Sequence, residues 1–270
     1  MKFSVTCALD TGEKTPVVLR GTYKECIETA SRIGYDAVEI HTGDPQEIDP
    51  DVLKELLTRF HMKLSSIGTG PAYGNYGLSL SSEDEEIRQQ AIAKIKDHIR
   101  LAKDFGAVVI LGLIKGLKKD CCSQERYYEL LDRSMRECIT EAERENVLLV
   151  FEIINRYESD VLNTIEEGID YIRRFDSDRI KLHIDSFHMN IEETDIPSAV
   201  IKAGKNIGHV HIADSDRWYA GHGHFDFAGM VDALKEIGYQ GVLSLESYKF
   251  PEPEVAAARN LEYFEVLQCV

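Results

Sequence analysis

Residues 147–152 read VLLVFE, and three further apolar runs of the same kind follow: IKLHID at 180–185, GHVHIAD at 208–214 and VLSLE at 242–246. Each run is short and rich in aliphatic or β-branched residues, which is typical of a buried strand. Each also carries an acid or a histidine at or near its end, namely Glu152, Asp185, His211 and Glu246. The intervals of 33, 26 and 35 residues each match one strand and one helix. This half of the chain therefore predicts four consecutive strand–helix units.

The same rhythm extends to the first half of the chain. Four earlier runs are also predicted as strands: Phe3–Leu9, Ala37–His41, Lys63–Gly68 and Val108–Leu113. The runs lack a clean alternation of apolar and polar residues, which is typical of strands covered on both faces. Amphipathic stretches separate the runs and predict eight helices: Thr22–Ile33, Asp51–Phe60, Ser82–Phe105, Gln124–Glu145, Thr164–Phe175, Pro197–Ala203, Phe227–Ile237 and Glu254–Leu267.

Strict alternation of eight strands and eight helices points to one architecture. Crossovers of this length make neighbouring strands parallel, and eight such units close into a (β/α)8 barrel. The sequence therefore predicts an α/β fold in which residues 1–270 form one TIM-barrel domain with its active site at the C-terminal ends of the strands. The alternative is an open doubly wound sheet, but no phosphate-binding GxGxxG follows the first predicted strand.

The charge balance excludes some classes of partner. The chain has 47 Asp and Glu against 31 Lys and Arg, a formal net charge of −16. A surface this acidic repels nucleic-acid phosphates and anionic membranes, so we expect neither as a partner. No apolar run is long enough to span a bilayer, and MKFSVTCALDTGEK at the start is too acidic for a signal peptide. We expect a cytoplasmic protein whose six cysteines are reduced thiols.

The four polar strand ends form a candidate metal site. In a barrel, Glu152, Asp185, His211 and Glu246 converge at the C-terminal mouth. Three carboxylates and one imidazole suit one divalent cation, Mn²⁺ or Mg²⁺ first, with Zn²⁺ and Co²⁺ as alternatives. Without a cation, the three carboxylates would repel one another. The alternative is that each acid only caps a helix or pairs with a nearby arginine.

Four segments around these residues resemble the tagatose 3-epimerase branch of the xylose-isomerase-like barrels: FEIINRYESDVLNT (151–164), HIDSFHMNIEE (183–193), HVHIADSDRWYAGHGHFDF (209–227) and LSLESY (243–248). The resemblance is strong from about residue 147 to residue 249 and weaker before residue 120. Those enzymes epimerise ketoses at C3 with one metal ion, so the resemblance implies a metal-dependent ketose 3-epimerase, with Mn²⁺ as the first choice of cofactor. It implies four metal ligands, Glu152, Asp185, His211 and Glu246, and three substrate contacts, Glu158, His188 and Arg217.

The chemistry of epimerisation assigns roles to these residues. Moving a proton at a carbon beside a ketone needs a base on one face of that carbon and an acid on the other. Glu152 and Glu246 come from opposite sides of the mouth, so we expect one to remove the C3 proton and the other to return one. Arg217 would stabilise the developing enediolate, and His188 would bond O1 or O2 of the sugar. Glu158 has an alternative, a surface pair with Arg156.

Other functions and partners stay open. The expected substrate is a small ketohexose or keto-hexonate, and the resemblance suggests a homo-oligomer, either a dimer or a tetramer. An aldose–ketose or hydroxypyruvate-type isomerase would use the same metal ligands, and a non-catalytic sugar-binding barrel would hold the metal without turnover. An apurinic endonuclease of the same superfamily would need more histidine ligands and a basic face, which the net charge opposes.

Two further segments near the expected mouth have two interpretations each. GTGPAYGNYGLSL (68–80) contains four glycines and two tyrosines, and it predicts either a lid or an ordinary surface loop. Lys115, Lys118 and Lys119 could attract an anionic sugar acid or sugar phosphate. For these lysines the favoured interpretation is solvated charge at the start of a helix.

Overall fold

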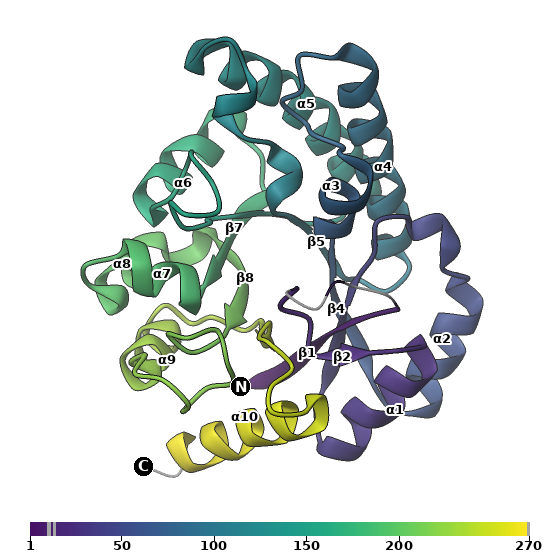
Figure 1. Ribbon diagram of the computed structural model, residues 1–270, viewed down its shortest axis with the longest axis vertical. Helices are drawn as coiled ribbons and strands as arrows, with labels where there is room; N and C mark the ends of the chain where they lie inside the picture. The colour runs from purple at the N-terminus through teal and green to yellow at the C-terminus, as the bar shows by residue number, and fades with distance from the viewer. Residues whose placement is uncertain (10–11, 13–14, 269–270) are drawn as a thin grey trace.

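The computed structural model describes residues 1–9, 12 and 15–268. Within these residues, nine strands form one sheet in the order β2-β1-β3-β4-β5-β6-β7-β8-β9, and all paired strands are parallel. β1 also pairs with β9, with Val5 opposite Leu245, and this closes eight strands into a barrel. Figure 1 shows the closed ring of strands with the helices outside it. The predicted (β/α)8 architecture is confirmed.

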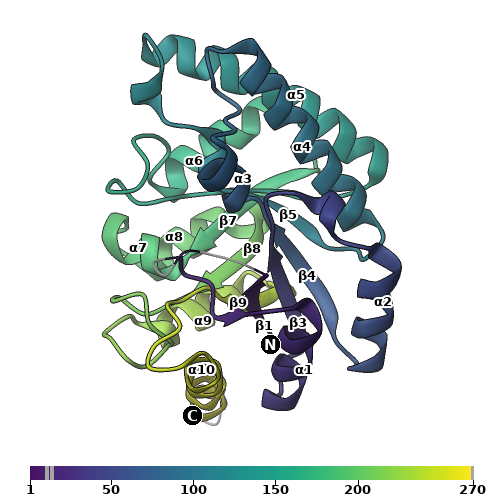
Figure 2. The ribbon, with the colours of Figure 1, turned by 45° about the vertical axis from the view of Figure 1, so that its right-hand side comes forward.

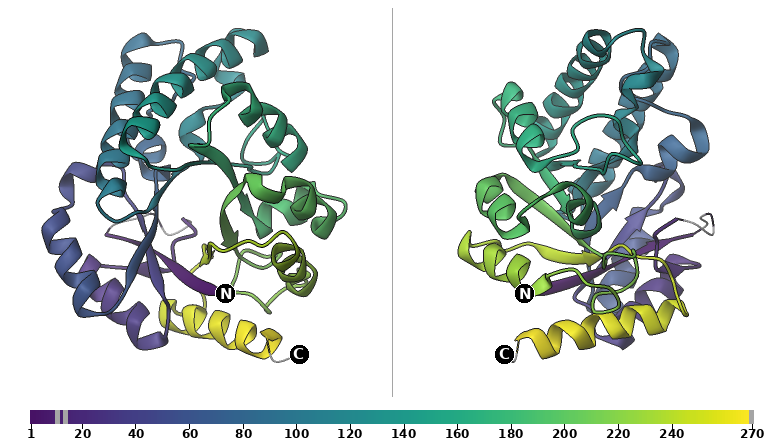
Figure 3. Two further views of the ribbon diagram at one scale, coloured as in Figure 1. Left: turned by 180° about the vertical axis from the view of Figure 1, so that it is seen from behind. Right: turned by 60° about the vertical axis from the view of Figure 1, so that its left-hand side comes forward.

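The eight predicted strands and eight predicted helices lie close to their expected positions, and one further strand and two further α-helices were not predicted: Leu19–Arg20, Gly70–Tyr76 and Ser186–Glu192. The strands are β1 (Lys2–Ala8), β2 (Leu19–Arg20), β3 (Ala37–His41), β4 (Lys63–Gly68), β5 (Val108–Leu111), β6 (Leu149–Glu152), β7 (Ile180–Asp185), β8 (Ile207–Ile212) and β9 (Val242–Leu245). The α-helices are α1 (Tyr23–Ile33), α2 (Pro50–Arg59), α3 (Gly70–Tyr76), α4 (Glu85–Lys103), α5 (Gln124–Glu145), α6 (Ile165–Ile172), α7 (Ser186–Glu192), α8 (Ile196–Ala203), α9 (Phe227–Glu236) and α10 (Pro253–Gln268). Short 3-10 helices are η1 (Pro45–Glu47), η2 (Leu113–Lys115), η3 (Lys118–Asp120), η4 (Arg173–Phe175) and η5 (Gly204–Asn206). Figures 2 and 3 show the helices around the barrel from the side and from behind.

Capping side chains fix the starts of several helices. Thr22 accepts a hydrogen bond from the N–H of Glu25, and the Glu25 carboxylate accepts one from the N–H of Thr22 at 2.9 Å, which starts α1. Asp84 accepts hydrogen bonds from the first free N–H groups of α4. Because a cap pairs N–H groups that the helix itself leaves unpaired, α4 begins at Glu85 rather than at the predicted Ser82.

Three barrel strands alternate polar and apolar residues, contrary to the expectation from the sequence. His211 Nε2 on β8 lies 2.8 Å from Glu39 Oε1 on β3, although these strands are not neighbours, so both side chains point into the barrel. Successive side chains of a strand point to opposite faces. The alternating apolar residues pack in the core with the helices: Val38, Ile40, Leu182, Ile184, Val210 and Ile212. A TIM-barrel interior is usually filled with branched apolar residues. Here polar residues occupy part of that interior.

Three expectations about loops, membranes and thiols can be compared with the structure. Residues 70–76 of the segment 68–80 form α3, which packs beside η2 at the end of β5. None of the helices within the described residues has the length and apolar character needed to cross a membrane. The five described cysteines are free thiols. Cys269 lies outside the described residues.

Candidate active site

The barrel brings the four predicted metal ligands together. Glu152 and Asp185 are the last residues of β6 and β7, His211 is the penultimate residue of β8, and Glu246 directly follows β9. One oxygen or nitrogen atom from each of these four side chains lies within 4.8 Å of the others. All four residues are buried. The interval of one strand–helix unit therefore places them at the same end of the barrel.

Two atoms of this group have no hydrogen-bond partner among the described residues. Asp185 Oδ2 and His211 Nδ1 are buried, unpaired and 3.9 Å apart. Asp185 does cap a helix, because its Oδ1 accepts a hydrogen bond of 2.7 Å from the N–H of Phe187 in α7. That contact leaves Oδ2 without a hydrogen bond. A buried polar atom without a hydrogen bond lowers the stability of the folded protein. Three carboxylates with one imidazole are donors that a divalent cation binds, so the residues present fit one metal ion.

Arg217 lies against two of the predicted site acids. Its guanidinium donates hydrogen bonds to Glu246 Oε2 at 2.8 Å and to Glu158 Oε1 at 3.2 Å, and it lies 4.6 Å from the centroid of the Phe187 ring. The Arg217 backbone has φ of 62° and donates a hydrogen bond of 2.8 Å to the carbonyl of Asp214. Because few residues with a side chain adopt positive φ, the backbone geometry marks this loop as a constrained one.

Glu158 faces Arg217 and not Arg156. Arg156 instead forms a bidentate pair with Glu192, with nitrogen–oxygen distances of 2.6 and 3.0 Å. Glu158 also accepts a hydrogen bond of 2.9 Å from the side-chain amide of Asn155. The surface pair considered from the sequence is therefore wrong.

Asn155 determines the orientation of His188. The side-chain oxygen of Asn155 accepts a hydrogen bond of 2.9 Å from the N–H of Tyr157, so its NH₂ group faces Glu158 and His188 Nδ1, the latter at 2.7 Å. His188 Nδ1 therefore accepts a hydrogen bond and the ring proton lies on Nε2. That Nε2 lies 3.6 Å from Glu152 Oε1. The result is an N–H donor directed toward the cluster of acids.

Neighbouring groups determine the ionisation of the acids. Burial raises the pKa of the Glu152 carboxyl, but the nearby imidazoles, first among them His183, outweigh it and hold this pKa well below its usual range. Burial also raises the pKa of Glu246, and His211 is the first of the neighbours that bring it below its ordinary value. For Asp185, burial prevails and raises the pKa. Glu152 and Glu246 are therefore both carboxylates at neutral pH and can accept protons.

Glu39 lies inside the barrel, and it was not among the site residues predicted from the sequence. Its Oε1 accepts hydrogen bonds from His211 Nε2 at 2.8 Å and from His41 Nε2 at 2.7 Å. Its Oε2 accepts hydrogen bonds from His209 Nε2 at 2.8 Å and from Ser66 Oγ at 2.5 Å. Burial raises the pKa of this carboxyl, but the three imidazoles outweigh it and hold the pKa well below its ordinary value. Glu39 is therefore a buried, ionised carboxylate.

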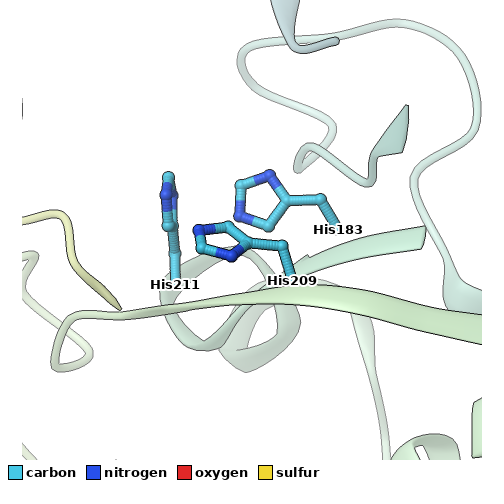
Figure 4. A group of neighbouring side chains, drawn as sticks. All are labelled: His183, His209 and His211. Atoms are coloured by element: carbon cyan, nitrogen blue, oxygen red, sulfur yellow. The ribbon is translucent and has the colours of Figure 1, made fainter. Parts of the chain in front are cut away.

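Two more histidines of the interior were also missed. Figure 4 shows the rings of His183, His209 and His211 gathered in one group. One nitrogen of each lies within 4.8 Å of the others, and neither nitrogen of His183 has a hydrogen-bond partner among the described residues. The sequence signal was the alternation in AVEIH (37–41), KLHID (181–185) and GHVHI (208–212), where polar residues recur at every second position.

Lys115 contradicts its favoured interpretation as a solvated charge. The side chain is buried, its Nζ donates a hydrogen bond of 2.8 Å to the backbone oxygen of Glu152, and it lies 5.3 Å from the centroid of the Phe151 ring. Burial lowers the pKa of Lys115 to about 8. The 3-10 turn η2 ends at Gly116, whose φ of 79° favours glycine, and this tight turn replaces the expected helix start.

A cavity of about 330 Å³ opens over the cluster of acids, a size suited to a small ligand. The predicted site residues on its walls are Glu152, Glu158, His188, His211, Arg217 and Glu246. Residues 68–71 and 73–75 also line it, so part of the segment 68–80 is cavity wall. Of the described residues, no lysine lines the cavity. Lys118 and Lys119 use their backbone N–H groups to bind Asp160.

The chain is similar to several known proteins. Residues 27–267 match the family described as xylose isomerase-like TIM barrel. An L-ribulose 3-epimerase from Mesorhizobium japonicum is 32% identical over 80% of this chain and 72% of its own length. A D-psicose 3-epimerase from Enterocloster bolteae is 30% identical over 84% of this chain and 77% of its own. A crystal structure of D-allulose 3-epimerase from Methylomonas sp. in complex with D-allulose is 25% identical, with a TM-score of 0.82 over 98% of this chain and 96% of that one.

Gly112 leaves room for the Glu152 carboxylate. A Cβ atom at Gly112 would overlap Glu152 Oε2. We expect Gly112→Ala to displace this carboxylate from the other three donors and to weaken Mn²⁺ binding about tenfold or more, measured by isothermal titration of metal-free protein. The melting temperature should change little, because the displaced atom ends a flexible side chain. Gly74→Ala is the control, since a Cβ there meets nothing within 4 Å. Equal Mn²⁺ affinities in the two variants would contradict the prediction.

Proposed function

The chain belongs to the xylose isomerase-like TIM barrel family, and we propose that it is a metal-dependent ketose 3-epimerase. The observation that carries this proposal is the buried cluster of three carboxylates and one imidazole that fits one metal ion, in which Glu152 ends β6 and Glu246 follows β9. Relatives named L-ribulose 3-epimerase and D-psicose 3-epimerase support the same reaction.

Four side chains would hold the metal: Glu152, Asp185, His211 and Glu246. We propose Mn²⁺ before Mg²⁺, Co²⁺ or Zn²⁺, because three of the four donors are carboxylates and one is an imidazole. The bound cation would supply Lewis-acid polarisation of the ketone oxygen of the substrate. Asp185 Oδ2 and His211 Nδ1 support this assignment, since both lie in the cluster and neither has a hydrogen-bond partner among the described residues.

Glu152 and Glu246 carry the proton transfers in this proposal. They come from β6 and β9, with two strands between them, so a sugar held in the cavity presents opposite faces of C3 to the two carboxylates. One glutamate removes the C3 proton and the carbon becomes planar in the enediolate. The other glutamate, protonated from solvent, returns a proton to the opposite face. The configuration at C3 inverts, and no bond between heavy atoms breaks.

Three polar side chains orient the substrate. His188 presents an Nε2–H donor to an oxygen of the sugar, because Asn155 occupies its Nδ1. Arg217 places a positive charge beside the developing enediolate and holds Glu246 at 2.8 Å. Glu158, with its side chain 41% exposed, accepts a hydrogen bond from a sugar hydroxyl at the solvent side of the cavity.

The charges of the cavity favour an uncharged ketose over a keto-hexonate or a sugar phosphate. Arg217 is the single arginine among the lining residues that the structure describes, and two carboxylates already pair with it. Lys115 is buried outside the lining and binds a backbone oxygen. Apart from the proposed metal ion, whose charge three carboxylates already balance, an anionic substrate would therefore meet further carboxylates and, among the described lining residues, no arginine or lysine without an acidic partner.

The proposed reaction can be tested by a screen of ketohexoses, ketopentoses, keto-hexonates and ketose phosphates with Mn²⁺ in D₂O, observed by NMR. We expect an uncharged ketose to be converted to its C3 epimer, with deuterium entering at C3 only. Deuterium at C1 or C2 with an aldose as product would instead indicate the isomerase. Binding of a sugar without exchange at any carbon would indicate the non-catalytic barrel.

Removal of the metal should abolish turnover. Dialysis against a chelator is expected to lower kcat by about 100-fold or more, because the polarising charge is lost, and added Mn²⁺ should restore it. Metal content is measured on the same samples by mass spectrometry. Full activity in protein shown to be free of metal would refute the mechanism.

Glu246→Gln should separate the two proton transfers. An amide cannot act as the base or the acid, so we expect kcat for epimerisation to fall by about 100-fold to 10,000-fold. Deuterium should still enter C3 of the one epimer whose hydrogen faces Glu152. The control is Glu236→Gln on the exposed end of α9, which should behave as wild type. The assay uses saturating Mn²⁺ with bound metal quantified, and exchange into both epimers at equal rates would remove Glu246 from its role.

A further inference from the structure

Glu39 takes no part in the proton transfers, yet one of its hydrogen bonds ends at a metal-site histidine. His211 Nε2 lies 2.8 Å from Glu39 Oε1, so the other ring nitrogen faces the donor cluster. His211 Nδ1 lies 3.5 Å from Glu246 Oε2 and 3.9 Å from Asp185 Oδ2, and it has no hydrogen bond among the described residues. One side of the imidazole is thus engaged with a carboxylate, and the other side is available to a cation.

The proton on this imidazole decides whether it can bind a metal. A neutral imidazole carries one proton, and only the nitrogen without it has a lone pair for a cation. A carboxylate has no proton to donate when ionised, so Glu39 Oε1 can only accept from His211 Nε2. With the proton held on Nε2, the lone pair of Nδ1 points toward Asp185 and Glu246. The opposite tautomer would place a lone pair against the carboxylate and an N–H in the metal site.

The Glu39 carboxylate is itself held in place. His209 and Ser66 donate to its second oxygen at 2.8 and 2.5 Å, and His41 donates to the first at 2.7 Å. Glu39 is 0% exposed. A carboxylate with donors on both oxygens and no access to solvent keeps one orientation. The hydrogen bond from Nε2 to this carboxylate therefore fixes the orientation of the His211 ring.

We propose that Glu39 is the positioning residue of the metal centre, fixing the tautomer and the ring orientation of His211 so that Nδ1 serves as the ligand. The proposal rests on the proposed function for the presence of the metal. Carboxylates that bind the second nitrogen of a metal-ligating histidine set its tautomer and raise its basicity, and their loss weakens metal binding. His41 shares the same oxygen of Glu39 and lines the cavity, so one buried carboxylate orients a histidine of the metal site and one of the cavity wall.

The test compares Mn²⁺ affinity in wild type, Glu39→Gln and Ser66→Ala, by isothermal titration of metal-free protein. Glutamine keeps the size of Glu39 but loses the charge and one acceptor oxygen, so we expect the Kd for Mn²⁺ to rise by about 10-fold to 100-fold. Ser66→Ala is the matched control, because it removes only one of the two donors to Oε2, where His209 still donates, and leaves the contact of Oε1 with His211 intact. Its Kd should stay within about threefold of wild type. If the Kd of Glu39→Gln for Mn²⁺ is also within about threefold of wild type, the proposal is overturned.

A second readout does not require metal or turnover. In protein labelled with ¹⁵N-histidine, the Nε2–H of His211 should give a downfield signal, assigned through its absence from His211→Gln. We expect this signal in wild type and in Ser66→Ala, with and without Mg²⁺, and its loss in Glu39→Gln. Its persistence in Glu39→Gln would overturn the positioning role.

The two readouts separate this inference from the proposed function. Wild-type protein that binds no Mn²⁺ would overturn the proposed function, while the imidazole signal would still decide the orientation by Glu39. If Glu39→Gln does not fold, as shown by circular dichroism, Glu39→Asp replaces it. Aspartate keeps the charge but is too short to reach His211. We therefore expect the Nε2–H signal to be lost and Mn²⁺ binding to weaken, as in Glu39→Gln. A wild-type signal together with a wild-type Kd would refute the proposal.

Discussion

Every second side chain of a barrel strand points inward, and in this protein that rule places ionisable groups where solvent cannot reach them. Charged groups taken out of water lose their hydration, so they persist only if hydrogen bonds and opposite charges replace it. In the barrel interior, hydrogen bonds and ion pairs connect several of these groups. Glu39 is bonded through both oxygens, and Arg217 lies between Glu246 and Glu158. These contacts stabilise Glu39, Glu246 and Glu158, whereas Asp185 Oδ2, His211 Nδ1 and both ring nitrogens of His183 have no hydrogen-bond partner among the described residues.

The inward-pointing residues form two levels along the barrel axis. On β7 and β8, His183 pairs in register with His209, and two residues further on Asp185 pairs with His211. At the deeper level His209 bonds to Glu39, and the ring nitrogens of His183 have no hydrogen-bond partner among the described residues. At the level nearer the mouth His211 also bonds to Glu39 and lines the cavity. The deeper level therefore helps to hold Glu39, and the outer level meets the ligand. This division explains why a cluster of buried histidines occurs under a site that uses only one of them as a predicted ligand.

The sequence predicted the residues at the strand ends but not the residues that orient them. The four predicted metal ligands could be found because one strand–helix unit separates each from the next, and closure of the barrel brings them to the same end: Glu152, Asp185, His211 and Glu246. Glu39 could not be found in this way, because its role depends on a contact across the barrel with a strand 170 residues away. Lys115 was misjudged because a charge after a strand usually meets solvent, whereas this side chain is buried and its Nζ donates to the backbone oxygen of Glu152. α3 was missed because its seven residues include two glycines and a proline, which are poor helix formers.

The two glutamates differ in their partners but share the direction of their pKa shifts. Glu246 is held by Arg217 at 2.8 Å, and Glu152 faces His188 Nε2 at 3.6 Å. In both, cationic or imidazole neighbours outweigh burial and lower the pKa. A reaction that interconverts two epimers must run in both directions, so each carboxyl must serve as base in one direction and as acid in the other. Two bases of very different strength would favour proton removal from one face of the sugar only. Because the barrel supplies each glutamate with its own counter-group, neither face of C3 is left with a carboxylate that burial has made unable to ionise.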